Sequence, residues 1–145
     1  VKRRFSFLGK IKNASIYDDY AHHPTEIKAS YQIAKQISRE KIIVIFQPHR
    51  YSRTKILQND FIKVLKTIDI LFLLDIYPAG EKPIRDVNSK ILVSKLKKMN
   101  TNTFYLKNQK QIRSYLQAYF DKDNTIVFMG AGSITHIAHN LFEKK

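Results

Sequence analysis

Cysteine is absent from the 145-residue chain, which excludes disulfides, thiolate zinc sites and a cysteine nucleophile. No apolar run approaches the roughly 18 residues that a membrane-spanning helix needs. The basic N-terminus is not followed by the apolar stretch of a signal peptide, so we expect a cytoplasmic protein. Glycine and proline are scarce, with four of each, and the chain shows no linker, repeat or low-complexity tract.

Acidic residues are also few: 12 Asp and Glu stand against 26 Lys and Arg, and the formal net charge is +14. The lysines are spread over the whole chain, and no basic helix or basic–aromatic RNA motif is present. This distribution favours an ordinary solvated surface over a nucleic-acid interface. Such a surface still attracts polyanions such as nucleotides and sugar phosphates.

Hydrophobic residues make up 43% of the chain, and with the chain length this predicts a single globular domain over residues 1–145. Short apolar runs alternate with segments of helical periodicity. The apolar runs predict strands at 1–13, 14–17, 41–47, 70–74, 104–106 and 125–129. The helical pattern predicts one helix that begins at Pro24 (with Ile27, Tyr31, Ala34 and Ile37 on one face) and others over 57–68, 92–99, 112–119 and 134–141. Five strand–helix units in a row predict an α/β fold of the Rossmann-like, doubly wound type: a mostly parallel sheet of about six strands with helices on both faces.

The loops that follow the predicted strands are the candidates for function, because ligands bind beyond the carboxyl ends of the strands in such sheets. Four of these loops hold chemically active side chains: 18–24, 48–53, 75–81 and 130–133. They contain three of the five histidines and two of the seven arginines, namely His22, His23, His49, Arg50 and Arg53. We therefore expect cationic and imidazole groups to converge on one edge of the sheet.

Two aspartates, Asp18 and Asp19, come directly before the first predicted helix. They could cap that helix, or they could accept hydrogen bonds from ribose hydroxyls. We expect no metal site here, because the adjacent His22 and His23 cannot both face one ion. His136 and His139 are predicted to lie on the surface of the last helix.

Arg50 and Arg53 are three residues apart at the predicted start of a helix, which would bring both guanidinium groups to the same side. Such a pair suits a carboxylate or a phosphate, although ion pairs with Asp60 or Glu26 are the alternative. The glycines of 130–132 would let the backbone approach an anionic ligand at a helix N-terminus. This turn follows the last strand rather than the first, so it does not indicate an NAD site.

Two common catalytic motifs are missing. The chain has no P-loop and no nucleophile elbow of the Gly-x-Ser-x-Gly type. The residues present can bind and orient anionic groups, but nothing among them activates a phosphoryl group.

Four sequence blocks resemble the C-terminal domain of the Mur ligases, the ATP-dependent ligases of peptidoglycan synthesis. The blocks are Val1-Lys2-Arg3-Arg4-Phe5, Asp18-Asp19-Tyr20-Ala21-His22-His23-Pro24-Thr25-Glu26, Phe46-Gln47-Pro48-His49-Arg50-Tyr51-Ser52-Arg53-Thr54 and Tyr77-Pro78-Ala79-Gly80-Glu81. They are long and collinear, and the resemblance covers essentially the whole chain. The third block points to the branch of the family that joins L-alanine to UDP-N-acetylmuramate.

This resemblance implies a reaction in which ATP phosphorylates the substrate carboxylate and the amino group of L-alanine attacks the acyl phosphate. A central domain of the family holds most of the ATP and the Mg²⁺ ion, and the C-terminal domain closes over it. The resemblance assigns ATP contacts to Arg4 and Asp19. It places Tyr20, His22, His49, Arg50 and Arg53 around the amino acid. It assigns no catalytic residue and no metal ligand to this domain alone.

The chain departs from the family in two ways. After Pro83-Ile84 the family usually has a glycine in a short loop, and the run Arg85-Asp86-Val87-Asn88-Ser89 lacks it. The N-terminal UDP-sugar domain and the central ATPase domain are missing, so we expect the chain alone to be inactive. The alternatives are a domain of the ligase that recycles murein tripeptide, a subunit that completes a separate ligase chain, and a stand-alone basic module that binds nucleic acid.

Overall fold

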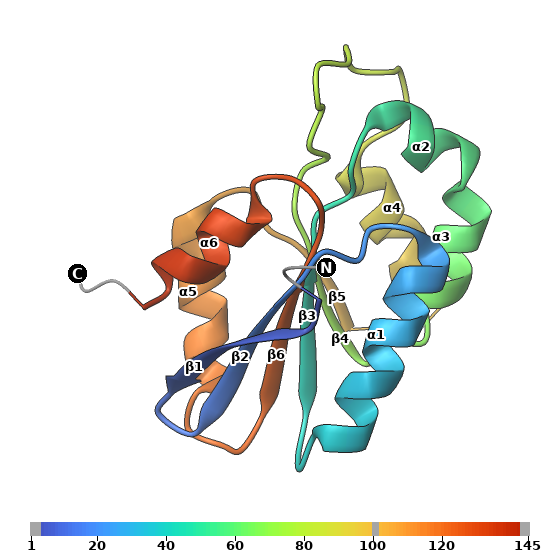
Figure 1. Cartoon of the computed structure of the whole chain (residues 1–145). Helices are drawn as coiled ribbons and strands as arrows, with labels where there is room; N and C mark the ends of the chain where they lie inside the picture. Colours follow the sequence, from blue (N-terminus) through green and yellow to red (C-terminus); the bar gives the residue numbers. More distant parts are fainter. Residues whose placement is uncertain (1–3, 100–101, 143–145) are drawn as a thin grey trace.

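The computed structural model describes residues 4–99 and 102–142, which form three layers with a sheet between two sets of helices (Figure 1). The six strands are β1 (Ser6–Ile11), β2 (Ala14–Asp19), β3 (Ile42–Phe46), β4 (Ile70–Leu73), β5 (Asn102–Tyr105) and β6 (Thr125–Met129). The helices are α1 (Pro24–Ile37), α2 (Tyr51–Ile56), α3 (Gln58–Leu65), α4 (Ser89–Lys97), α5 (Gln109–Leu116) and α6 (Ile134–Asn140), and a 3₁₀ turn covers Gln117–Tyr119.

The strand order is β1-β2-β6-β3-β4-β5. Every neighbouring pair is parallel except β1 with β2, which form an antiparallel hairpin. The predicted doubly wound α/β fold is therefore confirmed. Residues 1–3 of the first predicted strand lie outside the described residues.

Each face of the sheet packs against its own helices. On one face, α1, α3 and α4 cover a core that includes Phe46, Leu71 and Val127. On the other face, α5 and α6 cover a core that includes Ile45 and Phe128. The continuous apolar strands follow from this arrangement, because β3, β4 and β6 are buried on both faces.

The helices differ from the sequence prediction in two respects. The helix expected over 57–68 is preceded by a separate short helix, α2, and the two meet at Leu57, which ends one and begins the other. Ile37 and Met99, which share the periodicity of buried residues, are 46% exposed. Both lie at or beyond the last residue of a helix, where the apolar face no longer meets the sheet. No helix in the described ranges is long and apolar enough to cross a membrane.

The position of β6 explains where a site can form. β6 lies between β2 and β3, although it is the last strand in the chain. The chain leaves β2 towards the α1 face and leaves β6 towards the α6 face, so the connections diverge beyond the carboxyl ends of these strands (Figure 1). Ligands of open α/β sheets bind where connections diverge in this way.

Candidate functional site

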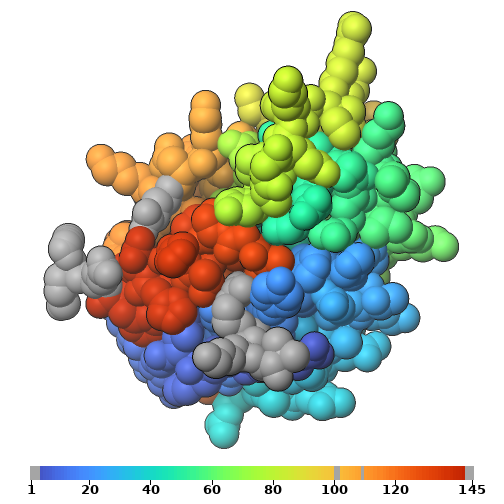
Figure 2. Space-filling model, turned by 45° about the horizontal axis from the view of Figure 1, so that its top comes forward, coloured from blue at the N-terminus to red at the C-terminus, as the bar shows by residue number. Residues whose placement is uncertain are grey.

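The loops after β2, β3, β4 and β6 meet at the carboxyl edge of the sheet (Figure 2). The β2 loop supplies His22 and the β3 loop supplies His49, and their ring centroids lie 5.7 Å apart. Two strands separated by a third lie about 10 Å apart. The rings can meet because β6 ends at Met129 and the chain turns away at Gly130, where φ is +156°. The predicted convergence of histidines on this edge is thus confirmed for His22 and His49.

The loops after β3 and β4 are bonded to each other beyond the ends of their strands. The Tyr77 N–H donates to the Pro48 carbonyl at 2.8 Å, and the Arg50 N–H donates to the Tyr77 carbonyl at 2.8 Å. The Tyr77 ring stacks on His49 with 5.5 Å between centroids and 21° between planes. These contacts hold the two loops together.

Arg50 has an unusual backbone conformation, with φ +76° and ψ +137°. A non-glycine residue in this region is strained by about 1–3 kcal/mol. Arg50 precedes α2 rather than belonging to it, and its Nη1 lies 3.9 Å from Oε2 of Glu81. Arg50 is the N-cap residue of α2 and Arg53 lies within the helix, so both stand at the start of a helix as predicted, although the backbone of Arg50 is not itself helical. The alternative partners, Asp60 and Glu26, are wrong for Arg50.

Glu81 holds the start of α2. Its carboxylate accepts the Ser52 N–H at 3.0 Å and also the Ser52 hydroxyl. These hydrogen bonds, that of the hydroxyl above all, lower the pKa of Glu81. Glu81 is therefore an anion at neutral pH, next to the guanidinium of Arg50.

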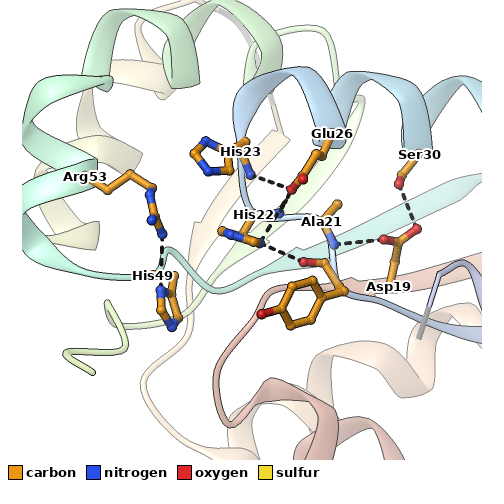
Figure 3. A network of polar contacts seen from close by, with 9 residues as sticks. Asp19, Ala21, His22, His23, Glu26, Ser30, His49 and Arg53 are labelled. Carbon is orange, nitrogen blue, oxygen red and sulfur yellow. Dashed lines mark hydrogen bonds and ion pairs between the residues drawn. The ribbon is translucent and has the colours of Figure 1, made fainter. Parts of the chain in front are cut away.

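Arg53 lies within α2 and points back to His49, with Nη1 3.2 Å from Nδ1 of the imidazole (Figure 3). Because a guanidinium only donates, Nδ1 of His49 must accept, and the proton of the neutral ring is on Nε2. Burial lowers the pKa of His49, and the positive charges of His22, Arg53 and Arg50 act in the same direction. His49 is thus a neutral imidazole at pH 7.

His22 and His23 are held by Glu26, one turn into α1. Oε1 of Glu26 accepts the N–H groups of His22 at 3.1 Å and of His23 at 3.2 Å. Burial raises the pKa of Glu26, but these two N–H donors outweigh it and the pKa is lowered. Tyr20 is 42% exposed, and its ring meets that of His22 edge-on at 5.1 Å.

Asp19 is 3% exposed and is bound on three sides by its own chain. It accepts hydrogen bonds from the Ser30 hydroxyl at 2.7 Å and the Ala21 N–H at 2.8 Å (Figure 3). It also accepts the Phe5 N–H at 3.1 Å. A carboxylate offers about four acceptor positions, so about one remains for a ligand. Arg4 and Asp19 border the same small hollow of about 40 Å³.

Neither aspartate caps α1, which was the alternative for this pair. The N-cap residue of α1 is His23, and Glu26 supplies the acceptor at that end. Asp18 instead accepts the Thr135 hydroxyl at 2.6 Å and so joins β2 to α6. The position of the two aspartates directly before a helix suggested capping. In the fold, β2 lies next to β6, and α6, which follows β6, brings the Thr135 hydroxyl to Asp18.

The glycines of 130–132 serve the packing of the chain itself. A Cβ on Gly132 would overlap the ring of Tyr77 and lie 2.8 Å from Oε1 of Gln47. The same Oε1 accepts the Ile134 N–H at 3.1 Å, at the start of α6. Side chains from the loops after β3 and β4 therefore occupy the space beside Gly132, and the approach of an anionic ligand to this turn stays a prediction.

The 83–88 loop, which lacks the glycine usual in the family, contains a residue with a left-handed backbone conformation. Asp86 has φ +63°, a left-handed conformation that aspartate tolerates better than most residues. The loop therefore contains a backbone conformation that suits glycine, although it is adopted here by an aspartate.

Two larger hollows are also present, and His23 is among the residues that line the first of them. One, of about 690 Å³, is a groove between α1 and α3 with Lys28, Lys35 and Lys63 among its lining residues. The other, of about 360 Å³, lies beyond the ends of β3 and β4, next to α5 and α6, and Tyr77 is part of its wall.

The predicted site residues thus fall into two neighbouring groups. The first contains Arg4 and Asp19 beside the start of α1. The second contains Tyr20, His22, His49, Arg50 and Arg53. Figure 3 shows His22 between the Asp19 carboxylate and the pair formed by Arg53 and His49.

Sequence reasoning gave no role to Tyr77 and Glu81, although it placed both in a loop at the correct edge. Their functional signal is a contact with another loop, which no local pattern contains. His136 and His139 lie on the exposed surface of α6, as predicted.

Residues 3–132 match the family described as Mur ligase, glutamate ligase domain. The chain is 38% identical over 143 residues to the UDP-N-acetylmuramate–L-alanine ligase of Carboxydothermus hydrogenoformans, covering 99% of this chain and 31% of that protein. It is 44% identical over 149 residues to the enzyme of the same name from Ruthia magnifica, covering 99% of this chain and 32% of that protein. The chain thus spans about a third of the length of these curated relatives.

Solved structures show the same fold. The UDP-N-acetylmuramate–alanine ligase MurC of Thermotoga maritima superposes with a TM-score of 0.75 at 28% identity, covering 97% of this chain and 29% of that chain. A murein peptide ligase from Psychrobacter arcticus superposes with a TM-score of 0.73 at 21% identity, over 97% of this chain and 29% of that chain.

Proposed function

The chain belongs to the Mur ligase family, as its glutamate ligase domain, and we propose that it is the C-terminal domain of a ligase that joins L-alanine to UDP-N-acetylmuramate in peptidoglycan synthesis. The observation that carries the proposal is the cluster of His22, His49, Arg50 and Arg53 at the edge of the sheet, in a chain that aligns over 99% of its length with ligases of that name. That alignment also favours a ligase over a nucleic-acid-binding module. The proposal includes the expected cytoplasmic location.

In this proposal the second group of residues binds the amino acid. Arg50 and Arg53 supply two guanidinium groups, and a charge-assisted bond from such a group both attracts and orients a carboxylate. His49 is neutral, so it accepts the bond from Arg53 without adding a competing positive charge. The anionic Glu81 offers a counter-charge to the ammonium group of the same amino acid. Holding the amine next to the acyl phosphate is the main service of this domain to the reaction.

The first group is proposed to meet ATP. Arg4 and Asp19 border one hollow, but about 40 Å³ is hardly more than the volume of one water molecule. A nucleotide would therefore lie against this surface, between this domain and the rest of the ligase. Asp19 has about one free acceptor position for a ribose hydroxyl, and Arg4 is exposed and available to a phosphate.

Among the residues that the structure describes, no three histidine, aspartate or glutamate side chains are grouped to hold a metal ion. We propose that Mg²⁺ and most of the ATP are held by the central domain of the complete ligase. The chain by itself is expected to be inactive, since it has no P-loop.

A fusion ligase tests this function. Residues 1–145 replace the matching third of the Carboxydothermus ligase, and ADP release is measured with UDP-N-acetylmuramate and L-alanine. We expect ADP release that depends on L-alanine. Arg53→Ala should raise the KM for L-alanine about tenfold or more, because one charge-assisted bond is lost, and should leave the KM for ATP unchanged.

The matched control is Arg113→Ala, since the Arg113 guanidinium bonds to the Leu141 carbonyl on the α5–α6 side of the molecule. This variant should keep both KM values. ADP release without dependence on L-alanine, or an Arg53→Ala variant with an unchanged KM for L-alanine, would contradict the proposal. Sequencing the coding DNA upstream of Val1 is an independent check: a P-loop in frame is expected, and a nearby stop codon would leave only a subunit of a split ligase.

A further inference from the structure

We propose that Tyr77 is a specificity-determining residue, whose ring separates the amino-acid site from an apolar pocket and so restricts the substrate to a small side chain. This inference rests on the proposed function. It starts from the position of Tyr77, which contacts His49 through its ring and also forms part of the wall of the 360 Å³ pocket.

The pocket beyond Tyr77 is suited to an aliphatic side chain. Leu74, Ile76, Ile112 and Ile137 supply its apolar lining. Two of its polar groups already have partners, because the amide of Gln47 donates to the Ser133 hydroxyl at 3.1 Å and accepts the Ile134 N–H. Asp75, Lys107 and Asn108 are further polar residues of the lining, and the Asp75 carboxylate accepts the Tyr105 hydroxyl. The four aliphatic side chains are the part of the lining that an apolar substrate side chain would meet.

The ring of Tyr77 is held in place from three sides. Its backbone N–H and carbonyl are both bonded to the β3 loop, at Pro48 and Arg50. One face of the ring stacks on His49. Its Cγ and Cδ2 lie against Gly132, so close that a Cβ atom at position 132 would overlap them. A ring fixed in this way acts as a wall rather than as a flexible cover.

In this proposal the Tyr77 ring limits the size of the substrate side chain. The Arg53 guanidinium contacts His49, and the Tyr77 ring stacks on the same imidazole. An amino acid whose carboxylate is bound by Arg50 or Arg53 would therefore lie close to both rings. A methyl group fits in front of such a wall, whereas a leucine side chain needs the space behind it. One extra methylene group in an apolar pocket changes selectivity by roughly 10–200-fold, so opening the wall should have a large effect.

The experiment measures kcat/KM for L-leucine and for L-alanine in the fusion ligase. In Tyr77→Ala, the ratio of leucine to alanine should rise at least about tenfold, and in Tyr77→Leu it should rise by less. Tyr77→Phe keeps the ring and should keep the ratio. Tyr115→Ala is the control for loss of an aromatic ring outside the pocket lining, since its half-exposed ring packs on Phe72 and Phe104, and it should also keep the ratio.

Folding is checked by circular dichroism and by an unchanged KM for ATP, and Tyr77→Leu replaces Tyr77→Ala if the smaller side chain unfolds the domain. A folded variant whose ratio stays at the wild-type value overturns the inference. Equal loss of activity with both amino acids also overturns it, because Tyr77 would then only position His49. A wild-type fusion that does not use L-alanine refutes the proposed function itself, and the inference falls with it.

Discussion

The strained backbone of Arg50 leads to a prediction that separates stability from function. Replacing Arg50 by glycine should stabilise the fold, although it removes a side chain from the proposed site. The strain at φ +76° and ψ +137° is about 1–3 kcal/mol for any residue with a Cβ, and glycine is free of it. The conformation is imposed by neighbours, since the Arg50 N–H is bonded to Tyr77 and its carbonyl accepts the Thr54 hydroxyl at 2.8 Å.

The reference variant is Arg50→Ala, which keeps the strain. Both variants lose the contact with Glu81, which at 3.9 Å and with the Arg50 side chain 46% exposed contributes about 0–1 kcal/mol. Glycine gives up about 0.4–1 kcal/mol because it has more freedom in the unfolded chain. The difference between the two variants should therefore be about 1 kcal/mol in favour of glycine, or roughly 4 °C in Tm for a domain of this size.

The assay is urea unfolding of the 145-residue chain, followed by far-UV circular dichroism, with the slope m compared between variants. Equal stability of Arg50→Gly and Arg50→Ala, at equal m, would refute the argument and show that the Arg50 backbone is not strained. In the fusion ligase, both variants should lose affinity for L-alanine alike, because both lose the guanidinium.

Two further predictions concern Gly132 and His49. Gly132→Ala should lower the free energy of unfolding by about 1–3 kcal/mol, because the new Cβ overlaps Tyr77 and crowds Gln47. Urea unfolding measures this, and an unchanged stability would mean that the turn is not packed as described. His49 has a lowered pKa in the folded chain, so the unfolded chain takes up its proton more readily. The contribution of neutral His49 to the free energy of unfolding is fully present above about pH 6.5. This contribution is lost as the pH falls below 6.5 towards the pKa that His49 has in the folded chain. Between pH 7.5 and 5.5 the wild type should therefore lose more stability than His49→Gln; equal losses would show that the His49 pKa is not lowered.

The cationic cluster shows how far sequence reasoning reaches in this protein. The location of His22, His49 and Arg53 at one edge was predictable, because parallel strands place their carboxyl ends together. The contact of Arg50 with Glu81 was not predictable, because Glu81 belongs to the loop after β4 and Arg50 to the loop after β3. No local pattern shows that these two loops lie against each other.

The chain's own sequence determined the alternation of strands and helices, the two-sided burial of β3, β4 and β6, and the family to which the domain belongs. These properties are local: they depend on the period of apolar residues and on motifs whose residues are neighbours in the chain. The tertiary structure alone decided that β6 lies between β2 and β3, that His22 and His49 meet beyond its end, and that Tyr77 fills the space left by Gly132. Such properties depend on which distant segments pair. The pairing of distant segments is decided by the apolar area that whole strands and helix faces bury together. It therefore depends on the complete chain and cannot be read from any single stretch of sequence.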